Sequence, residues 1–358
     1  MSWQSIRGHD QQVERFRRAL ARGRLASTFL FVGPAGIGKR RFALQLAQGL
    51  LCERMPQERL DPCGECPSCR QVLALSHPDV EVLGKPADKN FIPVELLIGD
   101  KEHRMQEGLL YNISRKPFSD RRKVAILDDA DYLNKEGANC LLKTLEEPPP
   151  KSLLILLGTS EQRQLPTIRS RCQIVRFNAL AENDVAELLV ERGLCTDPAL
   201  ARRAATHSRG SLSLALLWCD ERMSEFRSQL LGVLSHREMD APAAAKLIGQ
   251  FVDEAGKESA LKRERLRLAV SLAEEFYRAA LFQLAAGRPP ADAELAAAVA
   301  AALRWLPGDE AAACCLDICL DAYGHVDANV NQTLFIEWWL DELYNVAISR
   351  DQTWSRSA

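Results

Sequence analysis

The stretch GPAGIGKR, from Gly33 to Arg40, decides the fold of this chain because it is a phosphate-binding loop with one unusual residue. In the pattern G-x-x-x-x-G-K-[ST], glycines let backbone N–H groups surround phosphate oxygens, and the lysine neutralises their charge. Gly38 and Lys39 complete that cradle, and Gly36 is a further loop glycine. Arg40 replaces the Ser or Thr whose hydroxyl binds Mg²⁺, and arginine offers donors only. The loop predicts phosphate affinity, leaves ATP or ADP binding open, and argues against Mg²⁺ positioning and hydrolysis.

Apolar segments on either side of the loop predict the elements that such a loop connects. Residues 28–32 form a short apolar run, and apolar side chains recur at helical spacing over 39–51. Three further apolar runs predict strands: 123–127, 152–157 and 172–177. A helix is expected over 137–147, ended by three prolines. Apolar strands alternating with helices predict an α/β domain whose parallel sheet is covered on both faces.

Polar residues follow two of these predicted strands. Asp128 ends the run 123–127, where a carboxylate can hold Mg²⁺ through water. Asp129 stands where a longer glutamate commonly orients the attacking water, so we expect it to align water poorly. Thr159, just after the next strand, is a further candidate for nucleotide binding. The alternative is that these acidic residues only begin a polar loop.

Four cysteines form a compact cluster in the sequence: Cys52, Cys63, Cys66 and Cys69. Four thiolates suffice for tetrahedral Zn²⁺, and Gly64 permits the tight turn of a C-x2-C loop. An iron–sulfur cluster also uses C-x2-C-x2-C spacing, and free thiols are a third possibility. Structural zinc is the favoured interpretation, because the fourth cysteine lies upstream and nothing else in the sequence indicates electron transfer.

The bulk composition excludes some classes of protein. The 358 residues carry a net charge of −2, so nucleic-acid contact requires a local basic patch. No apolar run is long enough to span a membrane, and the first ten residues are polar. A cytoplasmic protein without membrane partners is expected. After residue 178 the pattern becomes helical throughout, which predicts three domains: 1–178, 179–240 and 243–345.

Three passages together resemble the clamp-loader branch of the AAA+ ATPases. They are the phosphate loop with its cysteine insert, the segment 128–149 (DDADYLNKEGANCLLKTLEEPP), and Ser170-Arg171-Cys172. The opening segment Ile6 to His9 also resembles the part of the family that packs near adenine. The similarity covers about residues 1–215. It implies an AAA+ domain with a zinc insert, then a small helical lid domain and an all-α collar domain that oligomerises.

The resemblance also implies a function. It implies a clamp-loader subunit of the replicative DNA polymerase III holoenzyme, with the gamma/tau and delta subunits, the sliding clamp and primed DNA as partners. Arg171 would be the arginine finger that acts on a neighbour's nucleotide. Ser213 lies where family ATPases often carry a nucleotide-sensing arginine, which further argues against hydrolysis.

Three alternatives stay open at this point. The chain can be an active gamma/tau-like ATPase, if Asp128 alone holds Mg²⁺ and Arg40 turns outward. It can be an interaction protein whose zinc loop binds DNA or a partner. Finally, an arginine such as Arg171 can be part of an ordinary surface ion pair, and residue chemistry alone favours that interpretation.

Overall fold

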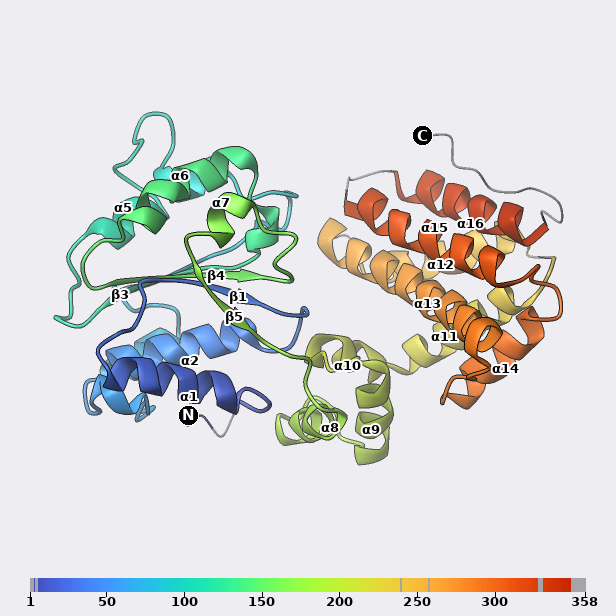
Figure 1. Cartoon of the computed structure of the whole chain (residues 1–358), viewed down its shortest axis with the longest axis horizontal. Coiled ribbons are helices and arrows are strands. Elements are labelled where there is room, and N and C mark those ends of the chain that lie inside the picture. Colours follow the sequence, from blue (N-terminus) through green and yellow to red (C-terminus); the bar gives the residue numbers. More distant parts are fainter. Residues whose placement is uncertain (1–2, 4–5, 239, 257, 328–330, 349–358) are drawn as a thin grey trace. The chain divides into compact units, whose positions relative to one another are not determined.

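The computed structural model describes residue 3 and residues 6–238, 240–256, 258–327 and 331–348. The chain divides into two compact units, Met1–Cys219 and Asp220–Ala358 (Figure 1). The first unit carries the sheet and the phosphate loop. No described helix is long and apolar enough to cross a membrane.

The first unit contains a parallel five-stranded sheet in the order β2-β3-β4-β1-β5. Its strands are β1 (Thr28–Val32), β2 (Val80–Leu83), β3 (Lys123–Leu127), β4 (Ser152–Gly158) and β5 (Gln173–Arg176). Every neighbouring pair of strands is parallel, so the predicted α/β class is confirmed. The sequence analysis missed β2, whose four half-buried residues form too short a run to stand out.

Helices cover both faces of the sheet (Figure 1). They are α1 (Asp10–Ala21), α2 (Lys39–Leu51), α3 (Pro67–Leu73), α4 (Val94–Ile98), α5 (Leu109–Ser114), α6 (Lys135–Glu146) and α7 (Pro166–Arg169), with two short 3₁₀ helices, η2 (Gln57–Arg59) and η3 (Ala130–Tyr132). Along β1, Phe31 packs against Phe16 and Phe42 of α1 and α2, whereas Leu30 and Val32 join a core with α4, α5 and α6. This alternation is the two-residue period of a strand buried on both faces.

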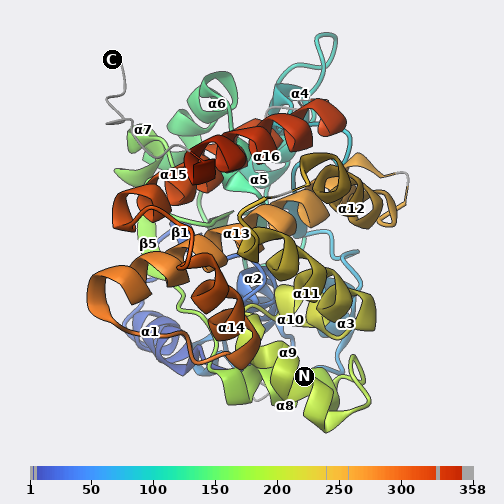
Figure 2. The ribbon, with the colours of Figure 1, turned by 90° about the vertical axis from the view of Figure 1, so that its right-hand side faces the viewer.

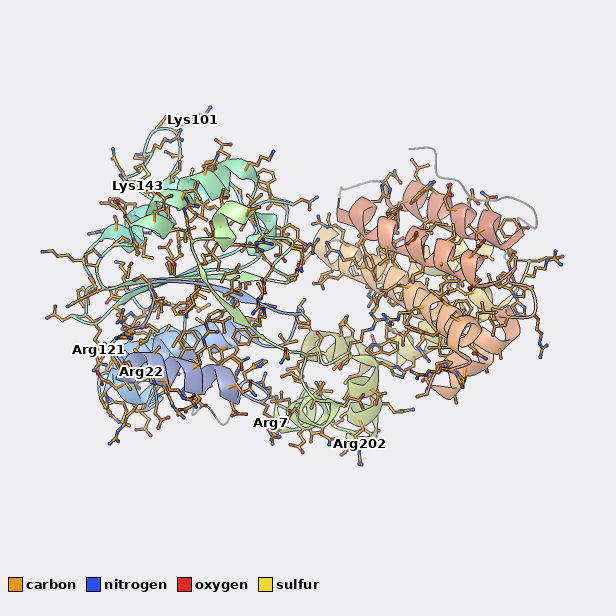
Figure 3. The ribbon with its side chains drawn as sticks, viewed as in Figure 1. Arg7, Arg22, Lys101, Arg121, Lys143 and Arg202 are labelled. Atoms are coloured by element: carbon orange, nitrogen blue, oxygen red, sulfur yellow. The ribbon has the colours of Figure 1, made fainter. Side chains whose placement is uncertain are left out.

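A group of three helices completes the first unit. It consists of α8 (Glu182–Glu191), α9 (Pro198–His207) and α10 (Leu212–Trp218), which pack on one another. Arg7 joins the amino-terminal segment to α8 through ion pairs with Glu187 and with Glu191, the latter at 2.5 Å (Figure 3).

The second unit is entirely helical over its described residues (Figure 2). Its helices are α11 (Glu221–Ser235), α12 (Ala241–Asp253), α13 (Ser259–Ala286), α14 (Ala293–Ala302), α15 (Asp309–Asp327) and α16 (Gln332–Ile348). Helix α11, which lies inside the predicted lid range 179–240, packs against α12, α13 and α14. The buried Arg227 of α11 binds Asp292 at 2.9 Å and also pairs with Glu294. The helical character predicted for this half is confirmed, while the division into three domains stays a prediction.

Candidate nucleotide and metal sites

The phosphate loop lies between β1 and α2, at the carboxyl edge of the sheet. Asp128 and Thr159 directly follow β3 and β4, the next strands of the sheet, so they reach the same edge. Arg171 lies at the opposite edge, because Thr28, the first residue of β1, donates its hydroxyl to the Arg171 carbonyl at 2.9 Å. The length of β1, about 13 Å, therefore separates the Arg171 backbone from the loop.

Glycines are required at three positions of the loop. A Cβ on Gly33 would lie 2.2 Å from the Phe177 carbonyl oxygen. One on Gly36, at φ +75°, would lie 2.2 Å from the Ser211 hydroxyl. Gly38, at φ +98°, has the left-handed conformation that starts α2. The backbone of a phosphate cradle is thus fully formed.

Lys39 is engaged by the loop itself. Its Nζ donates to the carbonyl oxygens of Gly33 and Pro34, both at 2.7 Å. Burial lowers the pKa of the Lys39 ammonium, against the raising effect of nearby carboxylates such as Asp128. In this arrangement two donors of the ammonium already have partners within the loop.

Arg40 faces the carboxylate that the sequence analysis assigned to Mg²⁺. Its Nη1 lies 3.7 Å from Oδ2 of Asp128, and the two side chains are 52% and 26% exposed. A guanidinium therefore lies beside the acidic residue at the position where the usual hydroxyl would share a metal ion. The outward-turned Arg40 that the active-ATPase alternative requires is not the conformation observed.

Asp129 has a different environment from Asp128. Its backbone has the left-handed φ of 55°, and its amide donates to Asp128 Oδ1 at 3.0 Å. Burial raises the pKa of the Asp129 carboxyl, and the neighbouring charge of Asp128 raises it further. Its role towards water stays a prediction.

Thr159 is held by Asp131. The Thr159 amide and hydroxyl donate to Asp131 Oδ2 at 2.8 and 2.5 Å, and Gln164 donates to the other carboxylate oxygen. Asp131 thus ties the end of β4 to the loop that precedes α7. The Thr159 hydroxyl proton is used inside the protein, which leaves only its lone pairs for another group.

Helix α10 contacts the phosphate loop. The Leu212 amide donates to the Gly36 carbonyl oxygen at 3.1 Å, and the Ser211 hydroxyl caps α10 by accepting from the Leu214 amide at 3.3 Å. The loop is therefore hydrogen-bonded to the helical group that follows the sheet. In the segment predicted to pack near adenine, Ile6 and His9 are buried, and His9 Nε2 lies 2.9 Å from the Ile37 carbonyl oxygen.

Arg171 is held by a carboxylate at the surface. Its Nε and Nη2 lie 2.7 and 2.6 Å from Oε1 of Glu146, the last residue of α6. Its Nη1 donates to the Thr167 carbonyl at 3.1 Å and to the Ser170 hydroxyl at 3.2 Å. The ion-pair interpretation of Arg171 is therefore correct for the isolated chain, and its action on a neighbour stays a prediction.

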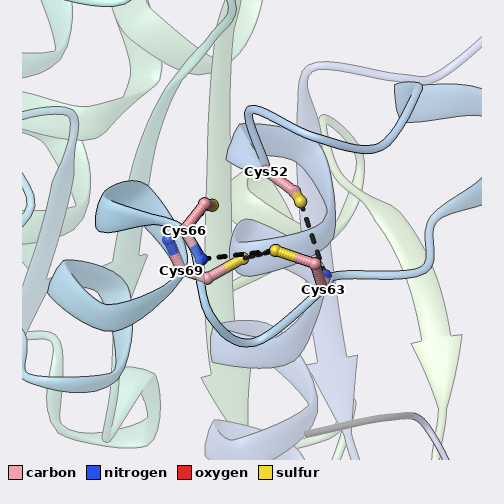
Figure 4. Close-up of side chains that lie close together, drawn as sticks. All are labelled: Cys52, Cys63, Cys66 and Cys69. Atoms are coloured by element: carbon pink, nitrogen blue, oxygen red, sulfur yellow. Dashed lines mark hydrogen bonds between the residues drawn. The ribbon is translucent and has the colours of Figure 1, made fainter.

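The four predicted cysteines converge (Figure 4). All four Sγ atoms lie within 4.8 Å of one another, and three of the residues are buried. A tetrahedral zinc ion with Zn–S bonds of about 2.3 Å needs sulfurs roughly 3.8 Å apart, so the donor set fits one ion after a small contraction. Backbone amides of Cys63, Cys66 and Cys69 donate to Sγ atoms of the cluster at 3.3–3.4 Å. Such N–H···S bonds favour thiolates, and the amide of Glu65, then that of Cys66, lowers the pKa of Cys63 to about 6.

The cysteine module is anchored to the domain at its amino edge. It starts at Cys52, directly after α2, and the buried Gln48 of α2 donates to the Cys69 carbonyl at 3.0 Å. The Ser68 hydroxyl bonds both the Leu51 carbonyl and His77 Nε2 at 2.9 Å. A bound ion would therefore stabilise the junction between α2 and α3.

The sequence analysis did not assign a role to three residues that the structure brings into the sites. Glu146 binds Arg171, Asp131 binds Thr159, and the Leu212 backbone binds Gly36. The two acidic residues lie within the segment 128–149 that resembles the family, which was the available signal. Nothing in the sequence indicated the contact of Leu212, since a backbone hydrogen bond does not depend on residue type.

Comparison with known proteins identifies relatives for this architecture. Residues 8–181 match the family model described as DNA polymerase III, delta subunit. DNA polymerase III subunit delta' of Pseudomonas aeruginosa is 38% identical over 154 residues, which are 42% of this chain and 43% of that protein. DNA polymerase III subunit tau of Escherichia coli is 30% identical over 228 residues, 62% of this chain and 33% of that protein. The chain thus spans less than half of the length of these two relatives.

Among the solved structures that match is that of a DNA polymerase III gamma-subunit-related protein from Thermotoga maritima. It is 18% identical, the TM-score is 0.41, and the match covers 94% of this chain and 99% of that one. The sheet, phosphate loop, cysteine insert and helical second half are the architecture that the resemblance to AAA+ clamp loaders implies.

Proposed function

We propose, from the match of residues 8–181 to the family model described as DNA polymerase III, delta subunit, that the protein is a clamp-loader subunit that does not hydrolyse ATP. It would assemble in the cytoplasm with gamma/tau and delta subunits and help to place the sliding clamp on primed DNA. It would donate Arg171 to the nucleotide of a neighbouring gamma/tau subunit.

The contact between Arg40 and Asp128 carries the proposal that the chain does not hydrolyse ATP. A Mg²⁺ ion at this edge would need Asp128 and would lie against a guanidinium, and two cationic groups at one carboxylate repel each other. The hydroxyl ligand is missing as well, because Arg40 has donors only. Nucleotide binding without turnover stays compatible with the formed cradle, provided that Lys39 leaves its two carbonyl partners.

The position of Arg171 supports action in trans. Its backbone is fixed at the amino edge of the sheet by Thr28, one strand length from its own phosphate loop. It cannot reach its own nucleotide site from there, but its side chain lies at the surface, 33% exposed. A guanidinium so placed can stabilise charge on the phosphate of an adjacent subunit.

For the cysteine module we propose structural Zn²⁺. All four donors belong to the protein, so the ion would have no open position for catalysis. It would fix residues 52–73 against α2 and thereby brace the amino edge of the sheet.

The isolated chain should be tested for ATPase activity. We expect no turnover above background with Mg²⁺, ATP and primed DNA, in the wild type and in Lys39→Ala alike. Arg40→Ser, matched with Arg41→Ser as a control on the same helix, should restore Mg²⁺-dependent nucleotide binding more readily than turnover, because Thr159 stays bound to Asp131. Robust wild-type hydrolysis that Lys39→Ala abolishes would refute the proposal.

An active gamma/tau-like ATPase is the second candidate. The specific observation in its favour is the similarity to the tau subunit of E. coli, which covers 62% of this chain. The two candidates differ in the same assay, because only the second gives turnover in the isolated chain.

A further inference from the structure

We infer that Glu146 is a positioning residue for Arg171, holding the guanidinium in the orientation in which it meets a neighbour's phosphate. This inference rests on the proposed function, since it assumes that Arg171 acts as an arginine finger. It starts from the geometry of one ion pair at the end of α6.

The ion pair engages one side of the guanidinium. Nε donates to Oε1 of Glu146 at 2.7 Å, and Nη2 forms an ion pair with the same oxygen at 2.6 Å. Nη1 makes the longer contacts with the Thr167 carbonyl and the Ser170 hydroxyl, at 3.1 and 3.2 Å. Because arginine has five N–H donors, Nη2 keeps at least one hydrogen without an acceptor among the described residues. That hydrogen, and the weakly held Nη1 next to it, form the edge available to a phosphate.

The backbone of Arg171 is fixed independently of Glu146. Thr28 donates to the Arg171 carbonyl at 2.9 Å, and the Arg171 amide donates to the Ile168 carbonyl at 3.1 Å. Thr28 and Ile168 are both buried. The base of the side chain is therefore rigid, and the only freedom left lies in its own torsion angles, which Glu146 restricts at the far end.

Restricting these torsions matters because an arginine finger must be oriented towards the phosphate whose charge it stabilises. A free arginine side chain loses rotamer entropy on ordering, and that cost would otherwise fall on each catalytic event. A misplacement of about 1 Å can cost as much as 10²-fold in rate. The pair itself contributes little to stability because both groups are exposed to solvent, 33% and 51%. Orientation, rather than folding, is the function that the geometry points to.

The neighbouring residue provides a matched control. Glu147, next along the chain, is also exposed and has no ion pair among those of the described residues. Glu147→Gln removes the same charge from the same surface without touching Arg171. Glu146→Asp keeps the charge but shortens the side chain by one methylene.

The test is the ATPase of the complex reconstituted from this full-length chain with the gamma/tau and delta subunits of the same organism, the clamp and primed DNA. We expect Glu146→Gln to lower kcat by on the order of tenfold while KM for ATP and assembly, followed by gel filtration, stay unchanged. Glu146→Asp should recover part of kcat, and Glu147→Gln should match the wild type. The double variant Glu146→Gln/Arg171→Ala should be no slower than Arg171→Ala alone, because Glu146 acts through Arg171.

The outcomes distinguish the positioning role of Glu146 from the arginine-finger role of Arg171. If Arg171→Ala lowers kcat strongly and Glu146→Gln leaves it unchanged, the positioning role is overturned while the arginine finger stands. Equal losses in Glu146→Gln and Glu147→Gln would also overturn it, because they would indicate a general charge effect. If Arg171→Ala itself leaves kcat unchanged, the proposed function fails and the inference fails with it.

Discussion

The two edges of the same sheet differ in how their charged groups are satisfied. At the carboxyl edge, Lys39 is bound by loop carbonyls, Asp128 faces Arg40, and Thr159 is bound by Asp131. At the amino edge, Arg171 forms an ion pair with one surface carboxylate, and four thiol groups converge. The charged and polar groups of the carboxyl edge are bound by other groups of the same edge. Arg171 at the amino edge instead lies at the surface, where a second molecule can reach it.

This difference is what the proposed loss of hydrolysis at one edge and the proposed action in trans at the other would require. The glycines of the loop have the backbone conformations that the motif requires, Lys39 binds loop carbonyls, and Arg40 lies 3.7 Å from Asp128. At the amino edge, Thr28 of the buried strand β1 fixes the Arg171 carbonyl, as the proposed arginine finger would require. Three experiments test this difference between the two edges.

Removal of the metal should have the largest effect, and it falls on the amino edge. We expect about one Zn²⁺ per chain by elemental analysis. Its loss through chelation or Cys66→Ser should melt residues 52–73, since structural zinc contributes on the order of 10 kcal/mol of apparent binding free energy. Limited proteolysis would detect cleavage in this segment. Visible absorption of an iron–sulfur chromophore would contradict the assignment, and Cys219→Ser, outside the cluster, is the matched control.

Comparing Arg171→Ala with Lys39→Ala tests directly which edge of the sheet supports ATP hydrolysis in the complex. In the reconstituted complex, loss of Arg171 should lower the ATPase rate by about 10³- to 10⁵-fold, as for other arginine fingers. Loss of Lys39 should change it less than about twofold, because the proposal gives its own loop no turnover. Steady-state ATP hydrolysis with primed DNA and clamp is the measurement. A large loss in Lys39→Ala would show that the carboxyl edge is active and would favour the gamma/tau-like alternative.

Asp131→Ala should have the smallest effect of the three and should act on stability. It removes the acceptor for the Thr159 amide and hydroxyl and for Gln164, so those donors lose their partner. We expect a loss of about 1–3 kcal/mol in the free energy of unfolding, measured by urea denaturation. Asp129→Asn, which keeps a side chain that tolerates the left-handed φ of 55°, serves as the comparison. A loss in complex ATPase as large as that of Arg171→Ala, without a loss of stability, would assign Asp131 to the chemistry instead.

The sequence predicted the parts that depend on local pattern. The strand 28–32 and the helix 39–51 were found at their observed bounds because apolar runs and helical spacing are read directly from residue order. The cysteine module was found because its spacing alone limits the chemistry. The short strand β2 was missed, since four half-buried residues carry little periodic signal.

Contacts between side chains far apart in the chain could not be predicted from the sequence alone. Arg40 was recognised as a departure from the motif, but the contact with Asp128 depends on the register of β1, β4 and β3 in the folded sheet. The same holds for Glu146 and Arg171, which meet only because α6 ends at the edge where β5 begins. Both pairs lie within or beside segments that motif analysis had identified. The sequence therefore indicated Arg40 and Arg171 as candidates, but it did not indicate the carboxylates that they contact.

The hydrogen bond from Thr28 to the Arg171 carbonyl affects how mutations in this protein would be interpreted. Since β1 supports the phosphate loop at one end and the arginine at the other, a packing defect in its core shifts both ends together. Such a lesion would leave nothing to measure in the purified chain, which is expected to have no turnover of its own. It would appear instead as slow catalysis by a different polypeptide, so a genetic screen could assign the fault to the wrong gene.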